Sequence, residues 1–184
     1  MNQVNIAAFS AFSLTVIAVY ILGFYPFIPT WAVFIAWACF FHLGGGANRQ
    51  QAYFATITHI GLGVIAAWLS ILAILNNPLT GELASQLWAP ILIGAVIAVL
   101  SKMGVMTRFC VTPAIIYGYA SVFAFVSIPG RFDLHTVLLL TFHNVLVAML
   151  VSVVLGATAG YMNAVVVQWL SGLLLKKKAT EVLQ

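Results

Sequence analysis

The sequence predicts an all-α membrane protein, and its composition is the first observation behind that prediction. Only 5% of the 184 residues are charged and 64% are hydrophobic, with a mean hydropathy of +1.12. A soluble domain has roughly 25% charged and 45–50% apolar residues. The chain has too few charges to cover a water-soluble surface. This excludes soluble, disordered and nucleic-acid-binding proteins and indicates a polytopic protein whose first partner is the lipid bilayer.

The second observation is the spacing of the breaks in the apolar sequence. A spanning helix needs about 20 mostly apolar residues, and turn-forming or charged residues separate six such segments. The predicted spans are residues 5–24, 31–43, 52–75, 87–100, 111–128 and 134–161. We treat 1–184 as a single transmembrane domain.

Each span ends at a recognisable break. In chain order the breaks are Tyr25–Pro29, Gly44–Arg49, Asn76–Pro78 followed by a polar loop to Gln86, Lys102 with Arg108, and Pro129–Asp133. Proline and glycine interrupt helices, and charged residues are costly in lipid. We expect no cleaved signal peptide, because no basic segment precedes the first span.

The last apolar stretch, Leu134–Leu175, has about twice the length that one span needs. Charge placement favours one span over two. With six spans and the N-terminus in the cytoplasm, all basic residues except Arg131 are cytoplasmic, whereas a seventh span would move Lys176–Lys178 outside. We therefore predict a span to about Tyr161, then an interfacial helix over about 163–178 and a cytoplasmic C-terminus.

Six spans also divide into two sets of three, which would have opposite orientations in the membrane. A shift of 84 residues pairs His59 with His143, and four further identities occur at this shift: Pro29 with Pro113, Ala36 with Ala120, Phe41 with Phe125 and Gly46 with Gly130. An inverted repeat would bring both histidines near the bilayer midplane, where transporter sites form. Chance identities are also expected in so apolar a chain.

Polar side chains inside the predicted spans are the candidates for a solute path. A polar group at this depth usually faces a bundle interior or a watery cavity. The candidates are His59, Thr56, His143, Asn144, Ser152, Tyr117, Ser121 and His42. The alternative is packing alone, because stripes of small residues let helices approach and buried polar groups bond across them.

A glycine run after the second span is a candidate for the cytoplasmic mouth of that path. Gly44, Gly45 and Gly46 permit backbone conformations closed to other residues, and Arg49 follows them. The alternative is a tight turn beside a charge that sets topology.

No enzymatic pattern is present in the sequence. The acids Glu82, Asp133 and Glu181 lie in predicted loops or the tail, and HExxH, GxSxG and CxxC motifs are absent. Cys39 and Cys110 lie inside or beside spans at the cytoplasmic side, and Cys110 has no nearby Cys or His partner in the sequence, so neither a disulfide nor a metal site is expected. We expect no enzyme, no cofactor and no metal.

Three motifs resemble a family of small bacterial inner-membrane proteins, domain of unknown function 1097. They are Phe40-Phe41-His42-Leu43-Gly44-Gly45, Pro113 with Gly118 and Phe123, and the segment Leu155 to Asn163. The resemblance implies a multi-pass protein of the bacterial inner membrane and implies no substrate.

The sequence leads to two hypotheses of function. The first is a channel or transporter for a small, neutral or weakly ionisable polar solute, with histidine able to carry a coupling proton. A chain this short encloses a pore with difficulty alone, so we expect a homo-oligomer. The second is a non-transporting membrane subunit that packs against a partner protein.

Overall fold

The computed structural model describes residues 3–106, 111–139 and 141–182. Arg108, which belongs to a predicted break, and Cys110 lie outside these residues. The described residues form seven helices: α1 (Gln3–Leu22), α2 (Thr30–His42), α3 (Arg49–Leu75), α4 (Glu82–Met106), α5 (Thr112–Val126), α6 (Leu134–Leu138) and α7 (Val145–Val182).

Four of the described helices, α1, α3, α4 and α7, are long and apolar enough to cross a membrane by length and composition. The other apolar helices are shorter, with 13 residues in α2 and 15 in α5. At 1.5 Å per residue these two measure about 20 Å, less than the roughly 30 Å hydrocarbon core. The all-helical, membrane-type architecture is therefore confirmed, with two helices of less than full span length.

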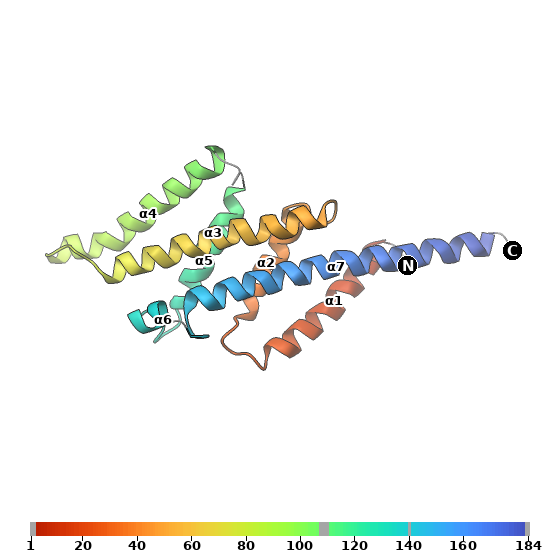
Figure 1. Cartoon of the computed structure of the whole chain (residues 1–184), viewed down its shortest axis with the longest axis horizontal. Helices are drawn as coiled ribbons and strands as arrows, with labels where there is room; N and C mark the ends of the chain where they lie inside the picture. Colours follow the sequence, from red (N-terminus) through yellow and green to blue (C-terminus); the bar gives the residue numbers. More distant parts are fainter. Residues whose placement is uncertain (1–2, 107–110, 140, 183–184) are drawn as a thin grey trace.

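The long helices α3 and α7 run in opposite directions beside one another through the middle of the molecule (Figure 1). The two short helices cross them. α2 packs mainly against α7, and α5 packs mainly against α3. On the outside, α1 contacts α7 and α4 contacts α3 and α5, and both outer helices run obliquely to the long helices (Figure 1). Each short helix thus packs on a long helix from the other half of the chain.

Glycines permit both close crossings. A Cβ on Gly63 of α3 would overlap the carbonyl oxygen of Ile115 on α5, and a Cβ on Gly118 of α5 would overlap that of Ile60. On the other side, a Cβ on Gly156 of α7 would overlap the carbonyl oxygen of Val33 on α2. Backbones this close gain dispersion contacts that lipid cannot replace, which is how helices associate in membranes.

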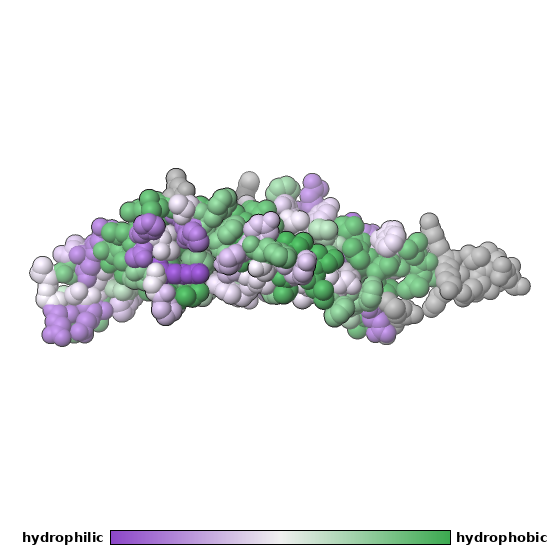
Figure 2. Space-filling view, turned by 90° about the horizontal axis from the view of Figure 1, so that it is seen from below, coloured by the Kyte–Doolittle hydropathy of each residue, from purple (hydrophilic) through white to green (hydrophobic). Residues whose placement is uncertain are grey.

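We name the two ends of the molecule after the residues there. The Arg49 end holds the end of α2 and the start of α3. The Glu82 end holds the end of α3 and the start of α4. Viewed from below, apolar residues cover much of the surface, and hydrophilic residues gather where α3 is connected to α4 (Figure 2).

Two helices differ in extent from the predicted fourth and sixth spans. α4 starts at Glu82 and ends at Met106 instead of covering 87–100, because Glu82 and the polar residues after it continue the helix. The predicted span 134–161 is broken at its start into the five-residue α6, a connecting segment, and α7 from Val145. Asn144 causes this break, because its side-chain oxygen accepts the backbone N–H of Leu146 at 2.8 Å and caps α7.

The separate interfacial helix predicted over about 163–178 is also wrong. α7 continues without interruption from Val145 to Val182, so no turn follows Tyr161. The same continuity removes the alternative of two antiparallel spans within Leu134–Leu175. Since the segment after Tyr161 contains no proline, polar residues such as Asn163 are not enough to stop an established helix.

Candidate functional site

His59 and Thr56 lie in the buried part of α3. Nδ1 of His59 is 2.7 Å from the carbonyl oxygen of Ala55, and His59 is 7% exposed. The hydroxyl of Thr56 donates to the carbonyl oxygen of Ala52 at 2.7 Å and is fully buried. Both side chains contact a carbonyl oxygen one turn earlier in α3. The helix's own backbone therefore satisfies part of their hydrogen-bonding capacity.

Ser152 and Ser121 are bonded in the same way on other helices. The Ser152 hydroxyl donates to the carbonyl oxygen of Ala148 at 2.7 Å, and Ser121 donates to Tyr117 at 2.7 Å. Ser152 is fully buried and Ser121 nearly so. These bonds need no solute or water, which agrees with the packing interpretation of these two serines.

His143 lies outside every helix, in the segment before α7, and is exposed. The prediction that it lies within a spanning helix is therefore wrong, because α7 starts only after it. Asn144 is buried and structural: its amide donates to the carbonyl oxygens of Val137 at 3.0 Å and Leu139 at 2.9 Å. Asn144 thereby ties α6 to the start of α7.

The structure does bring two other candidates together. His42 at the end of α2 and Tyr117 of α5 line a groove of about 420 Å³ with Ile35, Ala38 and Cys39. Both candidates are exposed, His42 at the helix end and Tyr117 at 41%. Because α2 and α5 come from different parts of the chain, sequence spacing alone did not show that these side chains meet.

The glycine run forms a turn with one left-handed residue. Gly44 has a φ of +85°, which side-chain-bearing residues rarely adopt, and Gly45 packs against the ring of Phe40, where a Cβ would not fit. Gly46 faces open space. Asn48 then caps α3 by accepting the N–H of Gln51 at 3.2 Å, which sets Arg49 at the start of the helix.

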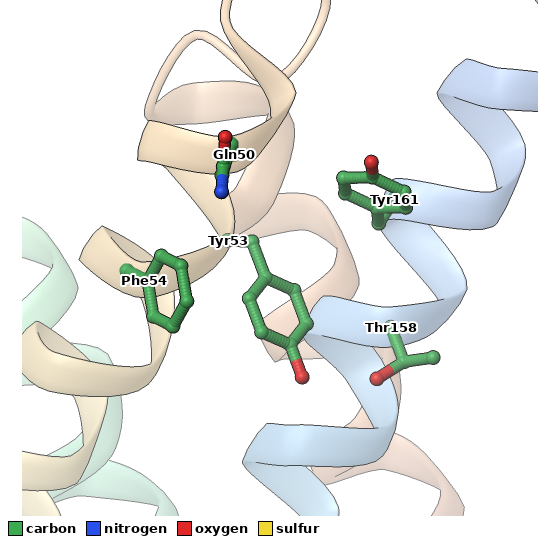
Figure 3. Close-up of a pocket in the computed structure, with 5 residues that line it drawn as sticks. All are labelled: Gln50, Tyr53, Phe54, Thr158 and Tyr161. Atoms are coloured by element: carbon green, nitrogen blue, oxygen red, sulfur yellow. The ribbon is translucent and has the colours of Figure 1, made fainter.

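Beside this turn lies a cleft between α3 and α7 that the sequence analysis did not find. We call it the tyrosine cleft; its volume is about 440 Å³ and its lining residues are Gln50, Tyr53, Phe54, Thr158 and Tyr161. The rings of Tyr53 and Tyr161 project into the space between the two helices (Figure 3), with centroids 6.1 Å apart. The guanidinium carbon of Arg49 stands 5.9 Å from the centre of the Tyr161 ring.

No sequence pattern that includes the tyrosines predicts the cleft. Tyrosine near a span end is typical of the aromatic belt at a membrane surface. Tyr53 and Tyr161 are far apart in the chain, so only the packing of α3 against α7 brings their rings together.

At the Glu82 end, α6 packs against the same two helices. Val137 of α6 is fully buried in the core cluster. The indole N–H of Trp68 on α3 donates to the carbonyl oxygen of Val137 at 2.8 Å, and this oxygen also accepts from Asn144. Hydrogen bonds from both long-helix segments therefore hold α6 in place.

Asp133 caps the start of α6. Its carboxylate accepts the backbone N–H of Thr136 at 2.6 Å, and this hydrogen bond lowers the pKa of Asp133 below its usual value of 3.8. Among the described residues, no cluster of three or more His, Cys, Asp or Glu side chains is arranged to hold a metal ion.

Apolar helices of spanning length, packed through glycines with few charges, define this chain as an α-helical membrane protein. Residues 7–168 match the family described as protein of unknown function DUF1097, and the chain belongs to that family. No curated protein and no solved structure matches it. The resemblance inferred from the glycine motifs is therefore confirmed.

Proposed function

We propose that this protein transports a small solute across a membrane, through a path between two halves of three spans each with opposite orientation. The observation that carries the proposal is the reciprocal packing of the helices. α2 packs on α7 as α5 packs on α3, and α1 contacts α7 as α4 contacts α3. A half-turn about the viewing direction of Figure 1 would approximately exchange α1–α3 with α4, α5 and α7. Inverted repeats of this kind build many secondary transporters.

The glycine crossings support a specific register between the halves. Gly63 meets Ile115 and Tyr119, while Gly156 meets Val33 and Trp37. The short helices therefore correspond at a shift of 82 residues, as in Val33 and Ile115. The long helices correspond at a shift of 93, as in Gly63 and Gly156. The difference of 11 equals the number of positions from Leu134 to Asn144, the stretch with α6 that the first half lacks.

Two apolar grooves support the same register independently. One lies between α1 and α7 and the other between α4 and α3. Leu155 and Met162 line the first groove, and the residues at the 93-residue shift, Leu62 and Leu69, line the second. This register replaces the 84-residue shift of the sequence analysis and pairs His59 with Ser152 instead of His143.

The six-span topology is part of this proposal. Six apolar helices that alternate in direction would set Arg49 and Lys102 on one side with the C-terminal lysines, and Arg131 on the other. The excess of basic residues would make the Arg49 end cytoplasmic, with both chain termini there. In line with the bacterial inner-membrane resemblance, we propose this membrane as the location and a homo-oligomer as the assembly.

The unequal ends of the α3–α7 pair support transport by alternating access. The tyrosine cleft is open at the Arg49 end, whereas α6 fills the equivalent region at the Glu82 end. A protein open on one side and closed on the other corresponds to one state of a transporter whose halves rock around a central site. Thr56 and His59 lie one and two turns further along α3 from Tyr53.

Flux into liposomes tests the proposal. Purified protein is reconstituted and uptake of labelled benzoate, glycerol and glycine is measured as an anion, a neutral solute and a zwitterion. We expect uptake of at least one probe above protein-free liposomes. His59→Ala should change the rate, and His143→Ala is the matched control that should not. No uptake of any probe contradicts transport.

A non-transporting membrane subunit is the second candidate function. Thr56, Ser152 and Asn144 are buried with hydrogen bonds to backbone groups, which favours dry packing of these candidates over a watery path. This candidate predicts no uptake and co-purification with a different membrane protein under mild extraction.

A further inference from the structure

We propose that the tyrosine cleft binds a small planar organic anion, with Arg49 recognising its negative charge. The inference rests on the proposed function, because it names the class of solute that would enter from the Arg49 end. Binding in the cleft is measurable without flux, so the two proposals fail separately.

The space is the first argument. A volume of about 440 Å³ lies within the range of small-molecule sites, about 300–1,000 Å³. The packing of α3 against α7 does not decide whether the space beside the two helices is open. At the Glu82 end, the buried Val137 of α6 lies beside the same helices. The cleft therefore lies at the end of the α3–α7 pair that α6 does not fill.

The walls of the cleft favour a planar solute. Tyr53 and Tyr161 stand nearly edge to face, with an interplanar angle of 78°, and Tyr161 is braced by Phe40 at 6.5 Å between ring centroids. Aromatic rings prefer offset or edge-to-face neighbours, so a third flat group would find a face at each tyrosine. The amide of Gln50 supplies both a donor and an acceptor at the rim.

The charge at the rim favours an anion. Arg49 stands over the Tyr161 ring, and no ion pair joins it to a carboxylate among the side chains that the structure describes. Of the acids whose side chains the structure describes, Glu82 begins α4 after the far end of α3, and Asp133 begins α6. An organic carboxylate would supply the partner that these acids do not, in the two-pronged geometry that guanidinium groups prefer. An organic cation would find no acidic residue among the lining residues.

An anionic lipid headgroup has the same charge as a free organic acid, and the experiment separates these sources. The protein is placed in phosphatidylcholine nanodiscs, and binding of labelled benzoate and benzamide is measured by equilibrium dialysis against empty nanodiscs. Benzamide has the same ring without the charge. We expect saturable benzoate binding and at least about ten-fold weaker benzamide binding, as for loss of one charge-assisted hydrogen bond.

Two pairs of variants assign the effect to the cleft. Arg49→Gln should weaken benzoate binding about ten-fold and leave benzamide unchanged, which also shows that the variant is folded. Lys102→Gln removes a charge from exposed α4 and is the matched control. Tyr161→Leu should weaken both probes, whereas Phe12→Leu on the outer face of α1, 67% exposed, should weaken neither.

The proposal is overturned if benzoate does not bind saturably, if benzamide binds equally well, or if Lys102→Gln acts like Arg49→Gln. Loss of benzoate binding in nanodiscs that also contain phosphatidylglycerol would overturn it in favour of a lipid headgroup. Benzoate binding without uptake of any probe would instead contradict transport and leave the site intact. Uptake of glycerol or glycine without benzoate binding would do the reverse.

Discussion

The two ends of the α3–α7 pair differ in what lies beside the helices, although the same two helices form both ends. At the Arg49 end, Tyr53 and Tyr161 border an open cleft of about 440 Å³. At the Glu82 end, Val137 is fully buried between the same helices and is bonded to Trp68 and Asn144. The difference comes from the short stretch before α7. The contacts of this short stretch therefore decide how the Glu82 end of the helix pair is filled.

The largest effect is expected at the glycine crossings, which the proposed repeat makes equivalent. Gly63→Ala and Gly156→Ala each place a methyl group against a backbone carbonyl, which should lower the free energy of unfolding by about 3 kcal/mol. Thermal unfolding in detergent measures the loss. Gly94→Ala, on α4 with no atom within 4 Å, is the matched control and should be neutral or slightly stabilising. A large effect at only one crossing would contradict their equivalence.

The second-largest effect is expected from releasing α6, which should make the two ends of the α3–α7 pair more alike. Asn144→Leu removes both amide bonds to Val137 and Leu139 and the cap of α7, so we expect α6 to dock less stably by about 2 kcal/mol. Hydrogen exchange of the α6 amides measures this opening. Asn76→Leu removes an exposed amide bond at the end of α3 and is the control. Unchanged α6 exchange in Asn144→Leu would show that other contacts hold the segment.

Trp68→Phe separates the hydrogen bond of the indole from its packing. The variant keeps an aromatic ring and removes the N–H that bonds to Val137, so α6 should be destabilised by about 1 kcal/mol. Trp88→Phe is the matched control, because its indole bonds to Ala73 within the α3–α4 region instead of to α6. Equal acceleration of α6 exchange in both variants would contradict a specific role of Trp68.

The smallest effect is expected from pH at the start of α6. The folded pKa of Asp133 is lowered by its hydrogen bond to Thr136, so its stabilisation is complete well above pH 3.8 and is lost as pH falls through the lowered value. Asp133→Asn keeps a capping oxygen and removes the titration. Amide protection of α6 should fall on acidification in the parent protein and stay flatter in the variant. The same decline in both would assign the pH dependence to another group.

Local sequence determined much of the fold. Low charge and long apolar segments were enough to predict the membrane class. Asn48 and Asn76 cap the two ends of α3, close to the breaks predicted from the sequence. Glycine motifs were enough for the family. These properties depend on the solvation and the backbone freedom of individual residues. Both can be inferred from composition and local sequence.

The site was less predictable, because its residues act through partners distant in the chain. Asn144 was a candidate for a solute path, yet its side chain caps α7 through Leu146 and Val147 and holds α6 through Val137 and Leu139. Its polarity was visible in the sequence, but the direction of its amide was not. His42 and Tyr117 were candidates on separate helices, and only the fold brings them to one groove.

The sequence by itself determined that this chain is helical, membrane-embedded and a member of its family, because transfer of apolar residues from water to lipid is nearly independent of their neighbours. Only the tertiary structure decided that α2 packs on α7 and α5 on α3, that His143 lies outside the helices, and that α6 fills one end while the tyrosine cleft stays open. Those outcomes depend on close crossings at Gly63, Gly118 and Gly156. A helix's own sequence shows that a close approach is permitted there, but not which helix makes it.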